Sequence, residues 1–183
     1  RSFHVTGVQT CALPILFRHE SYAAFDETQT RDERETAAHA KGLQYVGLEG
    51  DVGVIANGAG LAMSTVDVVN QVGGRSANFL DIGGGANAEV MADALEVINN
   101  DPEVRAIFIN IFGGIVRGEE IANGIVGALE RVSISSPIVV RLDGTNSAEG
   151  RAILEPHLSD HLRMASDMLE GARQAVALAA GEG

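Results

Sequence analysis

Cysteine, tryptophan and positive charge are the scarcest features of this 183-residue chain. It has one Cys, no Trp, 4% aromatic residues, and 13 Lys and Arg against 25 Asp and Glu, for a net charge of −12. A single Cys cannot form an internal disulfide, which excludes the disulfide-stapled class of secreted domains. The shortage of basic residues disfavours nucleic acid and anionic membranes as partners, because both are bound through Lys and Arg. No apolar run reaches the roughly 20 residues that a membrane-spanning helix requires.

Apolar residues and glycine are plentiful. Hydrophobic residues make up 45% of the chain, charged residues 21%, and there are 22 glycines. This balance is typical of a globular protein with a real core. Glycine in place of aromatic side chains suits close helix–sheet packing and backbone that approaches a ligand.

The amino-terminal segment is unlike a protein sequence. Residues 5–15 read VTGVQTCALPI and resemble the translation of a sequencing adapter, so we expect residues 1–15 to be non-native and to contribute nothing to the fold. A secretory signal is disfavoured because the segment lacks a proper apolar region and a small-residue cleavage site. Residues 16–42 are polar and charged and predict a connector with one helix near Asp32–Ala38, closed by Lys41-Gly42.

From residue 43 to 183 the sequence alternates between strand-like and helix-like segments. The predicted strands are Val52–Ala56, Ala77–Asp81, Ala106–Ile111 and Ile138–Leu142, with a weaker one at His161–Met164. The predicted helices are Leu61–Val72, Ala88–Asn99, Glu119–Val132, Ala148–Leu158 and Met168–Ala180. Such alternation indicates βαβ crossovers. The predicted fold class is α/β, a flavodoxin-like open parallel sheet with helices on both faces.

Glycine follows the predicted strands closely. The turns Asn57–Gly60, Gly83–Gly85 and Gly113–Gly114 each lead from a strand into a helix, and Asp143–Asn146 is a weaker version. In a parallel sheet these turns share the carboxyl edge, where ligands bind, and helix N-termini offer N–H donors to anions. Glycine in such turns is often purely geometric, and none of them is a Walker loop or a full GxGxxG. The flavodoxin-like strand order, however, places Asn57 and the Gly113–Val116 turn across one crevice, which favours a small-anion site.

Other candidate side chains are weaker. Asp81, ahead of three glycines, is either a base or a cap for its turn, and capping is expected. Arg117 either contacts an anion or projects into solvent. No pair of histidines has metal-ligand spacing, so no metal site is expected, and no Gly-x-Ser-x-Gly elbow indicates a hydrolase.

Four motifs together carry a family resemblance: VIANGAGLAMSTVD, SANFLDIGGGA, INIFGGIVRGEEIANGI and VVRLDGTN. In this order and spacing they resemble the β subunit of ADP- or GDP-forming succinyl-CoA synthetase, over about residues 16–180. The resemblance implies an acid–thiol ligase that converts succinate, CoA and a nucleoside triphosphate into succinyl-CoA, a diphosphate and phosphate. It also implies an α-subunit partner whose histidine carries the phosphoryl group, so no catalytic residue is expected in this chain.

The resemblance assigns site residues by motif. Asn57, Gly114, Ile115 and Val116 match substrate-binding positions, while Gly113, Arg117 and Gly118 match the helix N-terminus that faces the phosphate. Gly118 stands where many relatives carry another small residue. The family's ATP-grasp domain, with its sites for ATP or GTP and for Mg²⁺, is expected to be absent from this sequence, and residues 16–42 are expected to be its remnant or connector. CoA is expected to bind mainly on the α subunit. The isolated chain is expected to be inactive. Its expected location is the cytoplasm rather than the mitochondrial matrix.

Four other functions stay open. Malate–CoA ligase and ATP-citrate lyase share the domain, so the acid is less certain than the fold. A receiver-type signalling domain has the same topology but needs an acidic residue ending the third strand, where Asn110-Ile111-Phe112-Gly113 has none. A non-catalytic module that binds CoA or a nucleotide would also fit the isolated chain.

Overall fold

The structure is a computed structural model that describes residues 32–84, 86–114 and 116–182. Residues 33–183 form one compact unit, described here by itself. The predictions for residues 1–15 and for most of the connector lie outside the described residues. The helices are α3 (Glu33–Ala40), α4 (Ala59–Gln71), α5 (Ala88–Asn99), α6 (Gly118–Arg131), α7 (Ser147–Leu154) and α8 (Met168–Ala179), with a 3₁₀ turn at Glu155–His157. The strands are β1 (Gln44–Gly47), β2 (Val52–Ala56), β3 (Asn78–Asp81), β4 (Ala106–Gly113), β5 (Ile138–Gly144) and β6 (Leu162–Met164).

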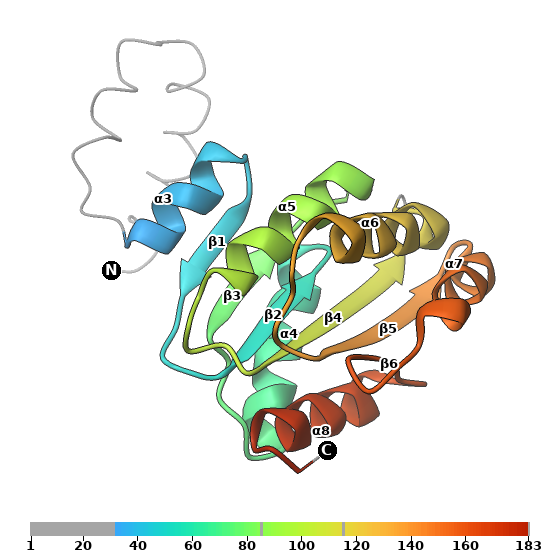
Figure 1. Cartoon of the computed structure of the whole chain (residues 1–183). Coiled ribbons are helices and arrows are strands. Elements are labelled where there is room, and N and C mark those ends of the chain that lie inside the picture. The colour runs from blue at the N-terminus through green and yellow to red at the C-terminus, as the bar shows by residue number, and fades with distance from the viewer. Residues whose placement is uncertain (1–31, 85, 115, 183) are drawn as a thin grey trace, which may run out of the picture. The chain divides into compact units, whose positions relative to one another are not determined.

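A six-stranded sheet is the centre of the unit, in the order β1-β3-β2-β4-β5-β6 (Figure 1). The five predicted strands are β2 to β6; they run parallel and follow the flavodoxin-like order second, first, third, fourth, fifth. The predicted fold class is therefore confirmed. β1 was not predicted: it pairs antiparallel with β3 at the sheet edge, where Tyr45 lies opposite Leu80.

Helices cover both faces of the sheet (Figure 1). On one face Ile107, Ile109 and Ile111 of β4 pack in a core with α5 and α6. On the other, Phe108 packs in a second core with α4 and α8. Full burial of such a side chain stabilises the fold by roughly 1.5–3 kcal/mol, so β4, buried on both faces, fixes the middle of the sheet. Within the described part of the chain, no helix is both long and apolar enough to cross a bilayer.

The predicted helix before residue 42 belongs to this compact unit. α3 ends at Ala40, and Gly42, with φ of 73°, closes it as predicted. Lys41 donates to Asp93 at 2.6 Å and Glu96 at 3.0 Å on α5, and the hydrogen bond to Asp93 is the main cause that raises the Lys41 pKa. The compact unit thus begins ten residues before the domain start predicted at residue 43.

α7 is shorter than predicted. The sequence pattern indicates a helix to Leu158, but the α-helix ends at Leu154 and a 3₁₀ turn follows. Pro156 is the physical reason, because its ring removes an N–H donor and clashes with the preceding helical turn.

Candidate functional site

Four glycine turns lie next to one another along the carboxyl edge of the sheet. They follow β3, β2, β4 and β5, which are consecutive in the sheet. β2 and β4 are hydrogen-bonded neighbours, with Ala56 opposite Asn110 at the end of their ladder. Asn57 and the turn after β4 are therefore adjacent, as the strand order predicts.

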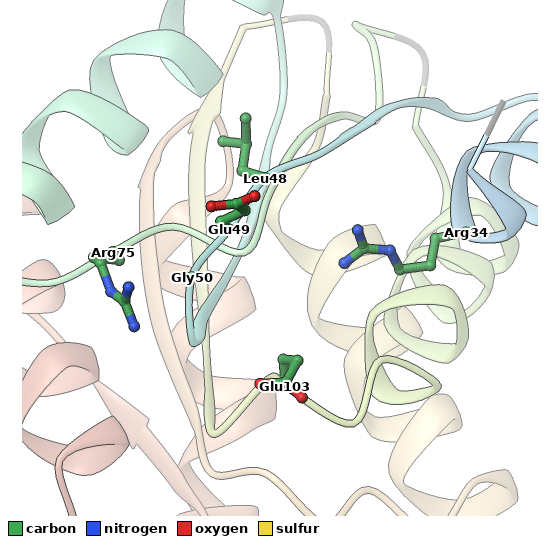
Figure 2. Close-up of a pocket in the computed structure, with 6 residues that line it drawn as sticks. All are labelled: Arg34, Leu48, Glu49, Gly50, Arg75 and Glu103. Atoms are coloured by element: carbon green, nitrogen blue, oxygen red, sulfur yellow. The ribbon is translucent and has the colours of Figure 1, made fainter. Parts of the chain in front are cut away.

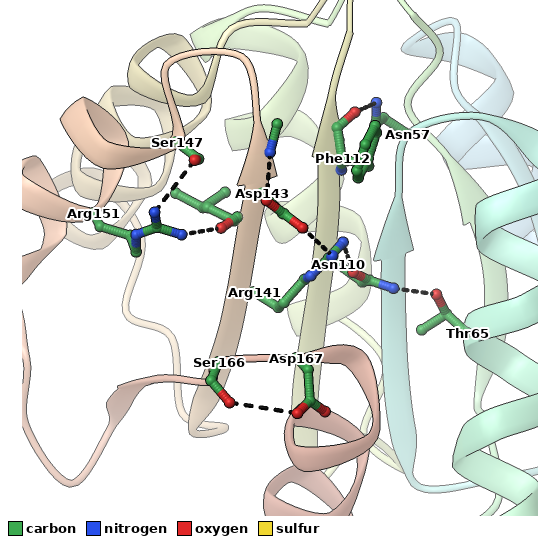
Figure 3. A network of polar contacts seen from close by, with 12 residues as sticks. Asn57, Thr65, Asn110, Phe112, Arg141, Asp143, Ser147, Arg151, Ser166 and Asp167 are labelled. Carbon is green, nitrogen blue, oxygen red and sulfur yellow. Dashed lines mark hydrogen bonds and ion pairs between the residues drawn. The ribbon is translucent and has the colours of Figure 1, made fainter.

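The side chain of Asn57 joins the two turns directly. Its Nδ2 donates to the Phe112 carbonyl oxygen at 2.8 Å, and its Oδ1 accepts from the Phe112 N–H at 2.8 Å (Figure 3). A carboxamide has two N–H donors and two acceptor lone pairs on its oxygen. These two bonds fix the orientation of the side chain. The second Nδ2 hydrogen and the second Oδ1 lone pair are still able to form hydrogen bonds.

Asp81 joins the turns after β2 and β3. Its Oδ1 accepts from the Gly58 N–H at 2.6 Å and from the Gly83 N–H at 2.7 Å. Gly58 is the N-cap residue of α4, so the carboxylate lies at a helix N-terminus. The predicted capping role of Asp81 is confirmed.

The turn between β4 and α6 is tied to the turn after β5. The Thr145 N–H donates to the Gly113 carbonyl at 3.0 Å, the Thr145 hydroxyl to the Gly114 carbonyl at 3.2 Å, and the Gly118 N–H to the Thr145 carbonyl at 3.0 Å. A Cβ on Gly113 would lie 2.6 Å from the Thr145 nitrogen, and one on Gly118 would lie 2.6 Å from the Asn146 oxygen. Neither position therefore has room for a side chain.

Gly114 differs from its neighbours because it is exposed and a Cβ there would have no atom within 4 Å. No side chain covers the Gly114 backbone on this side, so a ligand can approach that backbone without displacing a side chain. Val116 is buried, with 2% of its surface exposed, and its side chain anchors the turn in the core. Ile115, the remaining predicted substrate-binding residue, lies outside the described residues.

An ion pair lies at the start of α6. Arg117, the N-cap residue, reaches Glu119 with its Nη2 2.6 Å from Oε1, and Asn146 Nδ2 donates to the same oxygen at 2.9 Å. The hydrogen bond from Asn146 is the largest cause that lowers the Glu119 pKa, and Arg117 adds to it. Arg117 keeps 56% of its side chain exposed while paired.

Carboxylates at this edge are compensated locally. Asp143 pairs with Arg141 at 2.6 Å and accepts from the Gly144 N–H at 2.8 Å, while Asp81 and Glu119 have the donors described above. Unpaired carboxylates would repel an incoming anion, and pairing reduces that repulsion. The edge should therefore repel an incoming anion less than the net charge of the whole chain suggests.

The sequence did not indicate the contacts that three of these residues make. Asn57 contacts Phe112, which lies 55 positions further along the chain, and Asn146 contacts Glu119, which lies 27 positions earlier. The acidic first turn of α6 hinted at Glu119, since carboxylates favour helix N-termini. Nothing local in the sequence pairs it with Asn146.

A pocket of about 300 Å³ lies at the opposite edge of the sheet (Figure 2). Its lining carries both signs of charge, with Glu49 and Glu103 beside Arg34 and Arg75. Arg34 is already paired with the buried Asp101 at 2.5 Å. This pocket is separate from the glycine turns and brings together none of the predicted site residues.

Glu119 should make the stability of the domain sensitive to acid. Its folded-state pKa lies below the ordinary value of 4.5, so the ionised group contributes stability above that pH and loses it as the pH falls through the lower pKa. Glu119→Gln should therefore show a weaker loss of stability in this acidic range than the wild type, in urea unfolding followed by circular dichroism.

The exposed neighbour provides the control. Glu120→Gln should keep the wild-type pH dependence. Two other carboxylates also make the stability depend on acid in every variant. The Glu170 N–H lowers the pKa of Asp167 by donating a hydrogen bond to it, and Ser166 lowers the pKa of Glu170 in the same way. The same pH dependence in Glu119→Gln and wild type would contradict the prediction.

Comparison with known proteins identifies relatives by sequence and by fold. The chain is 50% identical over 164 residues to the succinate–CoA ligase (ADP-forming) subunit beta of Rubrobacter xylanophilus, covering 90% of this chain and 43% of the relative. It is 55% identical over 148 residues to subunit beta 2 of the same enzyme from Streptomyces coelicolor, covering 81% of this chain and 39% of the relative. The chain thus spans about two fifths of the length of the curated relatives it matches.

Solved structures share the fold at low identity. ATP citrate lyase from Methanothrix soehngenii, in complex with citrate and coenzyme A, matches with a TM-score of 0.64 and 20% identity over 84% of this chain and 43% of that one. The protein PH0766 from Pyrococcus horikoshii matches with a TM-score of 0.62 and 17% identity, over 84% and 41%. The profile of the CoA-ligase family matches residues 55–175, from the end of β2 into α8. The chain therefore belongs to the CoA-ligase family.

Proposed function

We propose that this domain is the part of a succinate–CoA ligase β subunit that holds the acid and the transferred phosphoryl group. The whole reaction would convert succinate, CoA and a nucleoside triphosphate into succinyl-CoA, a diphosphate and phosphate. Relatives of about 50% identity carry that enzyme's name. The observation that carries the proposal is the juxtaposition of an oriented Asn57 amide with the bare backbone at Gly114.

The chemistry of this site is electrostatic. Fixed N–H donors stabilise charge on a carboxylate or phosphoryl oxygen without reacting, and they need no reorganisation when that charge develops. Asn57 would supply a side-chain donor, and the turn from Gly113 to Gly118 would supply the α6 N-terminus. Arg117, held by Glu119 but still exposed, would face the phosphate side.

A partner is part of the proposal. The histidines that the structure describes, His39, His157 and His161, lie outside the four glycine turns. As the family resemblance implies, the phosphohistidine would come from an α subunit docked against the carboxyl edge, and the relatives' designation as beta subunits supports a heteromer. CoA would bind mainly on that α subunit.

Nucleotide and Mg²⁺ would bind elsewhere in the complete enzyme. Among the described residues, no group of three or more His, Cys, Asp or Glu side chains is placed to hold a metal. The relatives are designated ADP-forming, which favours ATP over GTP, and a cytoplasmic location stays a prediction.

Citrate and malate are the competing acids. A solved structure with the same fold binds citrate and coenzyme A, but its 20% identity supports the fold alone. The relatives of about 50% identity favour succinate. A non-catalytic binding module is the other alternative, and it would bind ligands without supporting turnover.

The functional test replaces Asn57. The assay would use a chimaera in which residues 33–183 replace the matching region of the Rubrobacter β subunit, assembled with that organism's α subunit. Asn57→Ala should lower kcat/KM for succinate by about 10²-fold, the typical cost of losing one preorganised donor. Phosphorylation of the α-subunit histidine by ATP should persist, because it does not need the acid.

Asn70→Ala provides a matched control, since Asn70 is an exposed Asn on α4 away from the turns. It should keep wild-type kinetics. Wild-type succinate kinetics in Asn57→Ala would remove that residue from the site. Preference for citrate or malate over succinate in the unmodified chimaera would favour the alternative enzymes.

A further inference from the structure

Arg141 lies directly behind the proposed site and is not one of its predicted residues. It is on β5, on the sheet face that α4 and α8 cover, and only 14% of its side chain is exposed. Its Nη2 reaches Asp143 Oδ2 at 2.6 Å and its Nη1 donates to Asn110 Oδ1 at 3.3 Å (Figure 3). The guanidinium thus bridges β5 and β4 close to the ends of both strands.

Asn110 extends this connection into α4. The residue is fully buried, and its Nδ2 donates to the Thr65 hydroxyl at 2.8 Å. Thr65 in turn donates to the Leu61 carbonyl at 2.7 Å. A buried amide needs partners for both of its ends, and Arg141 is the partner of the Asn110 oxygen.

Phe112 is the link to the site. The Arg141 guanidinium carbon lies 5.8 Å from the centroid of the Phe112 ring, within the range of a cation–π contact. Phe112 is 53% exposed, so this contact restrains a side chain that the core does not enclose. The Phe112 backbone is the part that Asn57 holds with two hydrogen bonds, and Gly113 and Gly114 follow immediately.

One detail argues that Arg141 is more than a stabilising residue. Its Nε is buried and has no hydrogen-bond partner within the described part of the chain. An unsatisfied buried donor is unfavourable for folding. Its main ionic partner, Asp143, is 51% exposed, so water would replace the guanidinium there if Arg141 were removed.

We infer that Arg141 is a positioning residue for the site: it holds Phe112 at the place where Asn57 binds its backbone, and so sets the distance between Asn57 and the Gly114 turn. It does not touch the ligand itself. The inference rests on the proposed function for its biological meaning, but its structural content concerns the free chain alone.

The test is amide hydrogen exchange by NMR on the ¹⁵N-labelled 183-residue chain without ligand. The Phe112 N–H reports the bond to Asn57 Oδ1, and the Ile109 N–H, buried in the middle of β4, reports the stability of the sheet. Arg141→Met should speed exchange of the Phe112 N–H about tenfold or more relative to the Ile109 N–H. Without the guanidinium the end of β4 would open locally more often, while the middle of the strand would still exchange only through larger unfolding. Arg141→Lys, which keeps the charge without the forked geometry, should give an intermediate rate.

Arg173→Met, an exposed arginine on α8, is the matched control and should leave both rates unchanged. Wild-type Phe112 exchange in both Arg141 variants would overturn the inference. Equal acceleration at Phe112 and Ile109 would also overturn it, because Arg141 would then be a general stabiliser. If Arg141→Met does not fold, the same comparison in Arg141→Lys decides. A chimaera that makes no succinyl-CoA would refute the proposed function without altering these rates.

Discussion

Gly144→Ala should lower the free energy of unfolding by about 3 kcal/mol or more, because two separate costs add. Gly144 has φ of 82°, in the left-handed region that an alanine rarely adopts. A Cβ there would also lie 2.1 Å from the Gly113 carbonyl oxygen. That oxygen accepts from the Thr145 N–H at 3.0 Å, and Gly113 pairs with Gly144 in the sheet, so the backbone has little freedom to move away.

Gly73→Ala separates the two costs. Gly73 has φ of 93° but no atom within 4 Å of its would-be Cβ, so this variant suffers the conformational cost alone. Urea unfolding of the 183-residue chain measures both variants, and Gly144→Ala should be clearly the less stable. Equal stability of the two would show that the turns after β4 and β5 are not packed as described.

Gly114→Val should have the opposite profile, with little effect on stability and a large effect on turnover. Gly114 is not in the left-handed region, and its Cβ position is open. The backbone conformation of Gly114 therefore does not disfavour a branched residue. A valine there would instead cover the backbone that the ligand is proposed to approach. The succinate-dependent rate of the chimaera should fall by about 10²–10³-fold.

Gly84→Val provides the matched control for this variant. Gly84 is also exposed, with an open Cβ position, but it lies in the turn after β3 and not in the proposed contact. It should keep most of the activity. Turnover by Gly114→Val at the wild-type rate, with unchanged unfolding, would mean that the Gly114 backbone is not approached by any reacting group.

Much of the fold could be predicted from local sequence. β2 and α5 have the predicted bounds, because a fully apolar run and an amphipathic helix with an Asn87 cap are strong local signals. β1 was missed for a physical reason. Only Tyr45 of its four residues is buried, and its strand conformation depends on pairing with β3, more than 30 residues further on.

The candidate site could be predicted only in outline. The strand order and the glycine turns place Asn57 beside the turn after β4, and the structure confirms that adjacency. Its fixed geometry comes from side chains that meet only in the folded sheet. The contacts of Asn57 with Phe112 and of Arg141 with Asn110 join residues 55 and 31 positions apart, and no local pattern encodes them.

The function proposed for this domain depends on an α subunit that covers its carboxyl edge and on the nucleotide-binding part of the complete enzyme. The most direct test is the initial rate of succinyl-CoA formation by the chimaera with its α subunit, with succinate varied and with malate and citrate as competing acids. We expect ATP-dependent turnover with succinate preferred, and a lower rate in both Asn57→Ala and Gly114→Val. A folded chimaera that assembles with the α subunit and phosphorylates its histidine, yet forms no succinyl-CoA from succinate, would contradict it.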